Sequence, residues 1–263
     1  MNAFFLGLKS YGRAWRLART ARLWPLLILP GLISLLYFPA IAYLTWRFGG
    51  RLTGYVWDHW LPAFLKQPYL EWIITAALWL LGLYLGFILF RNVIMILYSP
   101  VLGFLSGKTE EKAQPESPRP DLKKGILSGA VRGITMSLVS LFLEVGCFVF
   151  CVLLLLVPVI GQIAMVVVLP AAQMFLAGHG FMDPPLERRK VSVKESFRFV
   201  WQHRGRTLGC GCGFVLLSLI PVIGWFLAPT LGIVAGTLVT LDVAKEGRED
   251  LQKAAAARPV SAA

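Results

Sequence analysis

The stretch VPVIG runs from Val157 to Gly161, and the stretch IPVIG runs from Ile220 to Gly224. The two strings differ by one methylene group, and each lies inside a long run without charged residues. Proline followed three residues later by glycine disfavours a continuous helix, because proline lacks a backbone N–H and glycine is a poor helix former. The repeat therefore predicts two breaks in apolar helices, at Pro158–Gly161 and at Pro221–Gly224.

The lengths of the uncharged runs indicate what these breaks do. Val145–Met182 contains 38 uncharged residues, which as one helix would extend roughly 57 Å, about twice the hydrocarbon core. Thr207–Leu241 contains 35, and its arms beside the break have 14 and 17 residues, fewer than the ~20 needed to cross. Segments 126–182 and 207–241 are therefore predicted to be re-entrant hairpins that return to the side they entered. The alternative is a surface loop between two full spans at each break.

Composition assigns the chain to the membrane. Of its 263 residues, 57% are hydrophobic and 15% are charged, whereas soluble domains carry about 25% charged residues. Segments 23–46 and 72–98 are each apolar and long enough to cross the bilayer. The predicted fold is an all-α integral membrane protein, with two transmembrane helices at 23–46 and 72–98 and two partly penetrating hairpins, in a single domain covering 1–263.

The charged flanks predict the topology. Residues 47–71 contain three Lys and Arg, the fewest of any flank. Because basic residues favour the cytoplasmic side, we expect 47–71 to lie outside, with both chain ends inside and the protein in a bacterial inner membrane. Residues 107–124, with three prolines and mixed charge, predict a solvated cytoplasmic linker. Residues 242–263 predict a cytoplasmic tail.

Residues 1–22 predict a basic amphipathic helix in the headgroup region. Its expected apolar side is formed by Leu8, Tyr11, Trp15 and Ala18. The formal net charge of the chain is +12, and its basic residues lie beside apolar runs, so anionic lipid headgroups are the expected partner. Nucleic acid is not an expected partner, because no basic and aromatic recognition motif is present.

Four stretches of the chain resemble the CysZ sulfate permease family, within the etoposide-induced protein superfamily. They are LWPLLILPGLISLL, YSPVLGFLSGKTEE, VPVIGQIAMVVVLPAAQMFLAGHGFMDPPLERRKVSVKESFRFVWQHR and IPVIGWFLAPTLGIVAGTLVTLD. The resemblance covers most of the chain. It implies two long spans, two partly penetrating hairpins, a homo-oligomer, and uptake of sulfate for cysteine synthesis.

The resemblance also implies a place for the anion. In the CysZ subgroup, sulfate binds at a glycine–hydrophobic–arginine turn before the first span, and the matching place here reads TARLWP, with Arg22 but no glycine. A dianion requires guanidinium groups and free backbone N–H groups. Arg19 and Arg22 precede the first span, and Thr20 could cap it. These three residues are the candidate anion site; the alternative is that the arginines bind lipid phosphate and set the orientation.

Four other charged residues are candidates for a transport pathway. Arg91 and Glu144 lie deepest in apolar runs, and ionisable groups in a membrane are functional candidates. Either could instead extend to the interface. Asp183 and Asp242 follow the two hairpins at similar places, where they could alternatively cap a helix or pair with basic residues.

Three functional classes remain open. The first is a sulfate or other anion transporter, the second is a membrane-shaping scaffold that inserts hairpins, and the third is a membrane-bound enzyme. No catalytic, nucleotide-binding, cofactor or metal motif is present, and the four cysteines suit apolar packing. Without an ATPase motif, transport is expected to be passive, gradient-coupled or channel-like. The hairpins contain few polar residues, which weakens the transporter interpretation relative to the scaffold.

Overall fold

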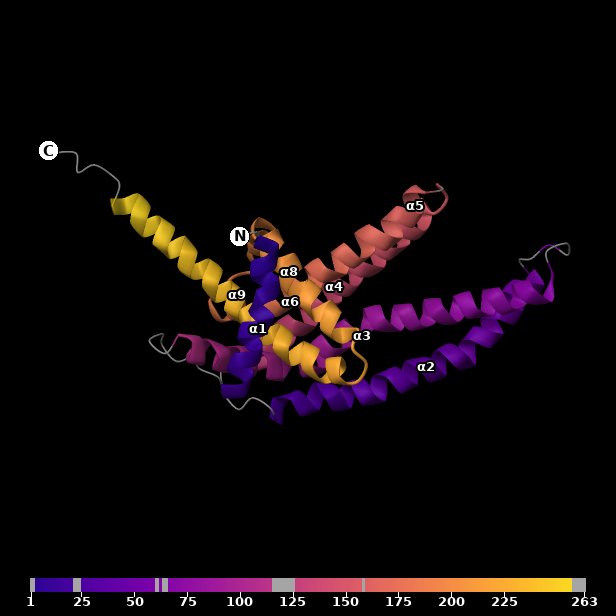
Figure 1. Ribbon diagram of the computed structural model, residues 1–263, viewed down its shortest axis with the longest axis horizontal. Coiled ribbons are helices and arrows are strands. Elements are labelled where there is room, and N and C mark those ends of the chain that lie inside the picture. The colour runs from indigo at the N-terminus through magenta and orange to yellow at the C-terminus, as the bar shows by residue number, and fades with distance from the viewer. Residues whose placement is uncertain are drawn as a thin grey trace.

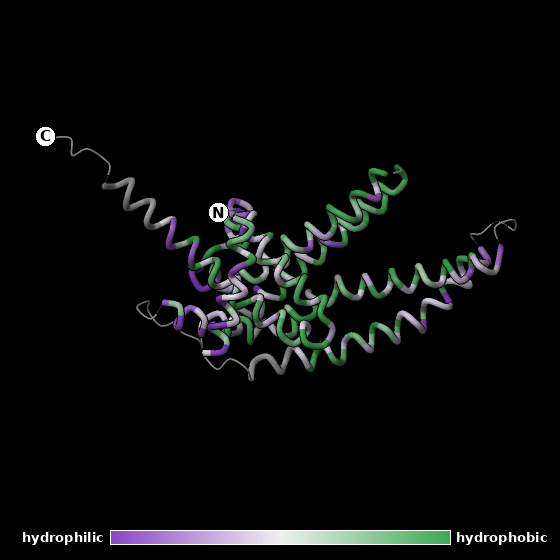
Figure 2. The backbone as a smooth tube through the Cα atoms, in the orientation of Figure 1, coloured by the Kyte–Doolittle hydropathy of each residue, from purple (hydrophilic) through white to green (hydrophobic). Residues whose placement is uncertain are grey.

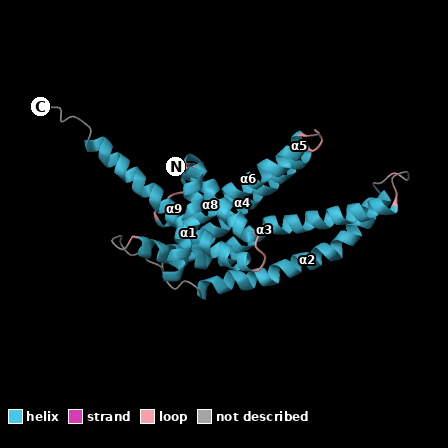
Figure 3. Cartoon of the chain, viewed as in Figure 1, coloured by secondary structure: helices cyan, strands magenta, loops and turns pink. Residues whose placement is uncertain are grey.

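The computed structural model describes residues 3–20, 25–59, 62, 66–114, 126–157 and 159–256. Within these ranges the chain forms helices joined by turns, and none of these residues forms a strand (Figures 1 and 3). The helices are α1 (Ala3–Thr20), α2 (Pro25–His59), α3 (Pro68–Ala113), α4 (Ile126–Leu154), α5 (Ile160–Ile163), the π-helix η2 (Ala164–Val168), α6 (Leu169–Arg188), α7 (Val193–Gln202), α8 (Arg204–Ser218) and α9 (Ile223–Ala256).

The helices form three hairpins and an N-terminal helix. Helices α2 and α3 run side by side as one long arm, and α4 and α6, joined through α5 and η2, form a second arm that diverges from it (Figure 1). The third hairpin, α8 and α9, lies where the arms meet. Helix α1 packs against both α8 and α9, so the first helix of the chain contacts the last hairpin.

Helix α9 is the central element of the core. In the 18-residue apolar stretch of α9 within Ile223–Gly247, 83% of the residues are buried, compared with 11% and 12% in the corresponding stretches of α2 and α3. The largest buried core side chains come from several helices: Phe90, Ile94, Tyr98, Phe181, Ile233 and Val234. Helices α2 and α3 therefore present most of their surface outward, whereas α9 is covered by protein.

The predicted all-helical class is confirmed. Among the residues that the structure describes, five segments are long and apolar enough to cross a membrane: Gly31–His59, Tyr69–Tyr98, Val131–Leu154, Ile160–Arg188 and Ile223–Gly247. The depth to which the second and third hairpins enter the bilayer stays a prediction.

The two long helices extend beyond the predicted spans 23–46 and 72–98, whose membrane bounds stay predictions. Helix α2 continues beyond residue 46 to His59, and α3 continues beyond residue 98 to Ala113. Close packing between these helices extends past the predicted end of the first span. A Cβ atom on Gly82 would lie 2.6 Å from the Thr45 side chain, and one on Gly49 would lie 3.0 Å from Trp79.

Both repeats interrupt the helices and do so with the same backbone. Val159 has a φ angle of 71°, and Val222, at the equivalent position, has a φ angle of 62°. A β-branched residue rarely adopts a positive φ, because its Cβ approaches the following carbonyl. After each turn the glycine N–H donates to the carbonyl four residues earlier, at 3.2 Å in Gly161 and 3.0 Å in Gly224. Pro158 lies outside the described residues.

The glycine of each repeat sits against the end of the preceding helix. A Cβ atom on Gly161 would lie 2.3 Å from the carbonyl oxygen of Leu154, and one on Gly224 would lie 1.8 Å from that of Leu217. In both turns this carbonyl is seven residues before the glycine. The shared sequence thus specifies a single compact turn that is used twice.

The helices also extend into the predicted linker and the predicted tail. Residues 107–113 of the predicted linker 107–124 belong to α3, which continues to Ala113. Glu110 accepts hydrogen bonds from Arg188 at 2.7 Å and from Arg189 at 3.2 Å, which hold this charged turn of α3 against the end of α6. The predicted tail 242–263 is helical as far as Ala256, where α9 ends in the described chain.

The face of α1 that packs on the protein coincides only in part with the predicted apolar side, since Ala18 is buried and Tyr11 packs against the core. The buried residues of α1 are Gly7, Ser10, Ala14 and Ala18, whereas Trp15 is 38% exposed. Backbones rather than large side chains meet here: a Cβ on Gly7 would lie 2.2 Å from the Arg206 carbonyl oxygen, and one on Gly209 would lie 2.0 Å from that of Phe4. Small residues permit this approach, so the buried face is the one with the smallest side chains.

Candidate functional site

The predicted anion site lies where α1 ends and α2 begins. Arg19 and Thr20 are the last residues of α1, and both are exposed. The Thr20 hydroxyl donates to the carbonyls of Arg16 and Leu17, each at 3.1 Å, so it closes α1 instead of capping α2. Arg22 lies outside the described residues. Helix α2 begins at Pro25, which leaves Arg19 as the described basic group at this junction.

Helix α1 is held in place by polar contacts with the third hairpin. Arg13 pairs with Asp242 through two hydrogen bonds, of 2.5 and 3.2 Å. The hydrogen bond to Asp242 raises the pKa of Arg13, which keeps the Arg13 guanidinium charged. The Tyr11 hydroxyl donates to the Cys210 carbonyl at 2.8 Å. Asp242, predicted as a pathway residue, is therefore a docking group for α1.

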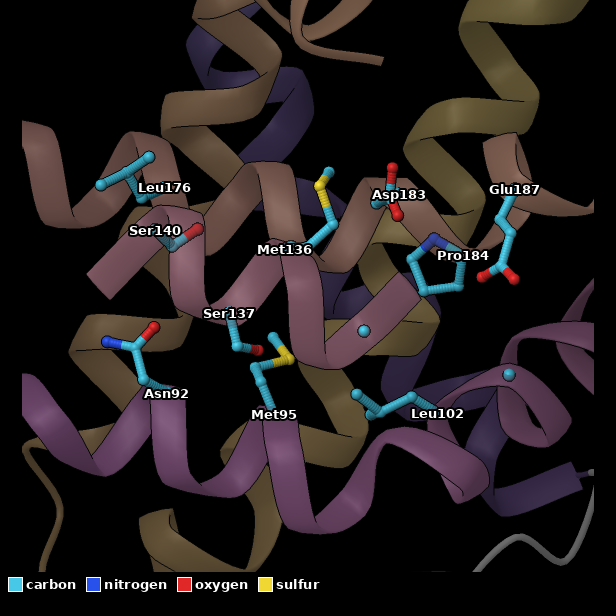
Figure 4. A pocket seen from close by; sticks show the side chains of 13 residues that line it. Asn92, Met95, Leu102, Met136, Ser137, Ser140, Leu176, Asp183, Pro184 and Glu187 are labelled. Carbon is cyan, nitrogen blue, oxygen red and sulfur yellow. The ribbon is translucent and has the colours of Figure 1, made fainter. Parts of the chain in front are cut away.

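A small cavity, lined by both apolar and polar side chains, lies between α3, α4 and α6 (Figure 4). Its volume of about 40 Å³ is room for roughly three waters, since one water needs about 10–15 Å³. The polar side chains that line it are Asn92, Ser137, Ser140, Asp183 and Glu187. In Figure 4, Asn92 comes from α3, the two serines from α4, and the two acids from α6.

Glu144 lies at one end of this polar region. Its side chain accepts a hydrogen bond of 2.7 Å from the Asn92 amide, and the residue is 2% exposed. A second cavity, of about 20 Å³, is lined by Glu144 and Gln173 among apolar side chains. Glu144 therefore lines the second cavity and binds Asn92, which lines the first. Arg91 precedes Asn92 in α3, and its side chain lies outside the described residues.

Asp183 lies at the other end and joins three helices. The Arg132 guanidinium of α4 donates to both carboxylate oxygens of Asp183, at 2.7 and 2.9 Å. The Ser196 hydroxyl of α7 donates to the same carboxylate at 2.6 Å, and Arg132 also donates to the Val191 carbonyl. The Asp183 carboxylate consequently neutralises the positive charge of Arg132 inside the protein.

The structure brings two of the four predicted pathway residues, Glu144 and Asp183, to one polar region, and it places Asp242 elsewhere. Reasoning from the sequence missed the residues between them. One signal was available: Ser137, Ser140 and Glu144 are spaced by three and four residues, which puts them on one face of a helix. A stripe of this kind in an apolar helix marks a polar contact inside a bundle.

The chemistry of the cavity does not suit an anion. Its described ionisable lining groups are the carboxylates of Asp183 and Glu187, and Arg132 is engaged by Asp183. A dianion entering this space would meet like charge and lose its hydration. Among the described residues, no cluster of three His, Cys, Asp or Glu side chains could hold a metal ion.

The nearby His179, Ser196 and Asp183 do not form a hydrolytic triad. Ser196 lies between the other two residues, contacting His179 Nε2 at 3.3 Å and Asp183 at 2.6 Å. Nucleophilic catalysis requires the histidine in the middle, where it takes the serine proton. Ser196 is also fully buried. This cluster joins α6 to α7 and does not provide an accessible nucleophile.

These features define a helical membrane protein with apolar arms, a protein-covered central helix and a small polar interior. The description "Sulfate transporter CysZ/Etoposide-induced protein 2.4" belongs to the family whose sequence pattern matches residues 10–229. Because the match covers most of the chain, this protein belongs to that family, a transporter-type membrane family. No curated protein matches the chain.

Proposed function

We propose that this protein is a sulfate transporter or channel of the CysZ type, located in the bacterial inner membrane, which supplies sulfate for cysteine synthesis. The observation that carries the proposal is the family match over residues 10–229. That range includes the end of α1, both long arms and both repeated turns. Sulfate or a related small anion is the proposed substrate, and a homo-oligomer in contact with anionic lipid is the proposed assembly.

The proposed anion contact is the junction between α1 and α2, formed by Arg19, Arg22 and the first turn of α2. The Thr20 hydroxyl stabilises the last turn of α1 through its hydrogen bonds to the carbonyls of Arg16 and Leu17. The first turn of a helix carries unpaired N–H groups and a partial positive charge, which favour an anion. The acidic lining of the interior cavity supports this assignment, because it leaves the basic junction as the better anion site.

We also propose that the α4–α6 and α8–α9 hairpins enter the bilayer without crossing it. Helix α8 has 15 residues, fewer than the ~20 that a span requires. Figure 2 supports the proposal: the tip of the α4–α6 arm is hydrophobic, whereas the end of the α2–α3 arm is hydrophilic. At the first tip, Leu156 is 83% exposed. An apolar tip favours lipid, and a polar tip favours water beyond it.

A second function is favoured by the same tips and by the cavity. A scaffold that shapes membranes needs apolar hairpins inserted in one leaflet but no anion path. Along the described chain the polar cavity is small and acidic, and both tips expose large aliphatic side chains. The scaffold function would apply to this member of the family if sulfate does not bind.

Sulfate binding to Arg22 variants tests the transporter proposal. A charge-assisted hydrogen bond typically contributes about 1.5–3 kcal/mol, so we expect Arg22→Ala to weaken binding by roughly tenfold or more. Arg22→Lys should restore only part of the affinity, because lysine lacks the planar fork. Calorimetric titration of purified protein and uptake of radiolabelled sulfate into proteoliposomes are the two measurements.

The matched control is Arg16→Ala, which removes an exposed arginine of α1 six residues before Arg22 in the sequence. We expect this variant to bind sulfate as the wild type does. Equal weakening by Arg16→Ala and Arg22→Ala, with full rescue by lysine, would indicate a diffuse attraction to lipid or ions. Absence of sulfate binding by the wild type at millimolar concentration would contradict the transporter proposal and favour the scaffold.

A further inference from the structure

Helix α7 is a short amphipathic helix between the second and third hairpins. Its start is fixed by a capping box, in which the Ser192 hydroxyl accepts from the Glu195 N–H at 3.3 Å and the Glu195 carboxylate accepts from the Ser192 N–H at 2.9 Å. The hydrogen bonds from Ser192 lower the pKa of Glu195. The single acid of α7 is therefore engaged at the helix start.

One face of α7 is anchored to the protein. Ser196 donates to Asp183, and Val200 is fully buried with Met182 and Val239. Ser196 and Val200 are four residues apart and lie on the same side of the helix. Their contacts fix the rotation of α7, so the opposite face has a defined direction.

The opposite face carries two cations and an exposed indole ring. Lys194, Arg198 and Trp201 follow one another at spacings of four and three residues, which aligns them along the helix. All three are exposed, and Trp201 is 63% exposed, with one edge of its ring against Phe175 at 5.5 Å between centroids. We call these three residues the α7 stripe.

The position of α7 relates the stripe to the membrane. Helix α7 begins five residues after α6, whose apolar segment Ile160–Arg188 is long enough to span. The exposed Lys190 lies in the connection between them. Basic residues beside an apolar membrane segment favour the cytoplasmic leaflet, which carries anionic lipid, whether or not the segment crosses the bilayer. Tryptophan prefers the level of the headgroups.

We propose that the α7 stripe docks on the headgroups of anionic phospholipids. The cations of Lys194 and Arg198 meet the phosphates, and the Trp201 ring enters the boundary between headgroups and acyl chains. Charge complementarity favours this occupant over a second copy of the chain, because α7 of a copy would present the same positive stripe. It also accounts for a large exposed aromatic ring beside cations on a helix whose other face is fixed.

The depth of the stripe in nanodiscs tests the proposal. A nitroxide label at position 201, from Trp201→Cys in an otherwise cysteine-free chain, is compared in discs of neutral lipid and in discs that contain phosphatidylglycerol. We expect the label to be shielded from an aqueous nickel reagent and accessible to oxygen with phosphatidylglycerol. A label at Gln202, which is exposed but lies off the stripe, should stay accessible to the nickel reagent.

Charge reversal separates docking from general attraction. Each basic residue near an anionic surface contributes roughly fivefold to membrane partitioning, so the loss of two cations alone lowers the ratio of docked to undocked label by about 25-fold. Lys194→Glu with Arg198→Glu also adds two repelling charges and should lower the ratio by at least that factor. The matched control reverses Lys108 and Lys112, two exposed lysines with the same spacing on α3, and should leave the label docked.

Two outcomes would overturn the proposal. One is a label at position 201 that stays accessible to the nickel reagent in both kinds of disc. The other is shielding that is equal in both lipids and unaffected by charge reversal, which would assign the stripe to contact with protein. Neither outcome depends on sulfate binding, so this test is independent of the proposed transport.

Discussion

At the scale of single residues, each repeated turn combines one strained position with one crowded position. Val222 holds a positive φ, and Gly224 touches the Leu217 carbonyl closely enough to exclude a Cβ atom. Substitutions at these two positions therefore have opposite effects. Glycine can replace Val222 without strain, whereas a residue with a side chain cannot replace Gly224 without displacing its neighbours.

Substitutions at the two positions should therefore change stability in opposite directions. A residue with a side chain in the left-handed region costs about 1–2 kcal/mol, so Val222→Gly should stabilise the protein by about 1 kcal/mol. Gly224→Ala forces a backbone shift and should destabilise it by about 1–3 kcal/mol. Thermal unfolding in detergent, followed by near-ultraviolet circular dichroism, measures both.

The first turn provides a repeat of the experiment. Gly161→Ala meets the Leu154 carbonyl and should destabilise the protein in the same direction as Gly224→Ala. Stabilisation by either alanine, or destabilisation by Val222→Gly, would mean that the turns differ from the compact form described above.

At the scale of helices, Asp183 is the point where three elements are joined. It lies on α6, pairs with Arg132 of α4 and accepts from Ser196 of α7. The side chains of Arg132 and Asp183 are 14% and 6% exposed. A pair this enclosed is strongly affected when one charge is removed, because the remaining ion lacks its partner.

Asp183→Asn should destabilise the protein by about 3 kcal/mol. Replacing both residues, with Arg132→Leu and Asp183→Asn, should recover much of this loss, because no unpaired charge remains. The control is Glu246→Gln, which removes the partner of Arg206 at a side chain that is 57% exposed and should cost less than about 1 kcal/mol. Equal effects of the two single substitutions would contradict a structural role specific to Asp183.

Individual helices were predictable from the sequence to different degrees. The breaks at the repeats follow from local chemistry, because proline and glycine act on the backbone wherever they occur. The buried face of α1 could not be read in this way, since its burial depends on Gly209 and Gly205 of α8, about 200 residues away. The start of the linker was missed because Glu110 is held by Arg188 of another helix.

Residues of the candidate site were likewise predictable where the signal was local and not predictable where it depended on the fold. Arg19 and Thr20 were located from their position before an apolar segment, a local signal. The polar cavity combines Asn92, Ser140 and Asp183 from three helices, and only the fold places them together. Sequence reasoning identified Glu144 and Asp183 as unusual charges, but their partners Asn92 and Arg132 required the helices to be placed.

At the scale of the whole molecule, labelling from outside tests the depth of the hairpins. Tyr55 and Val222 are similarly exposed in the protein, at 55% and 48%. A difference in labelling between the two positions would therefore be caused by the membrane and not by burial within the protein. With single cysteines at these positions in a cysteine-free chain, we expect an impermeant maleimide added outside to label position 55 but not position 222.

A permeant maleimide is the control, and it should label both positions once the cells are solubilised in detergent. Strong labelling of position 222 by the impermeant reagent in intact cells would mean that the α8–α9 turn reaches the outer surface. The hairpins would then be full spans, and the alternative of surface loops between spans would be correct.

The contact between α1 and α8 also sets the order in which the molecule is assembled. Tyr11 binds the carbonyl of Cys210, 199 residues later in the chain. At about 5–20 residues per second, the ribosome delivers α8 roughly 10 to 40 s after α1. During that interval the small-residue face of α1 has no partner, and its arginines can hold it on the headgroups of the membrane. The first helix to be synthesised is thus among the last to reach its final position, and it stays on the membrane surface until α8 has been made.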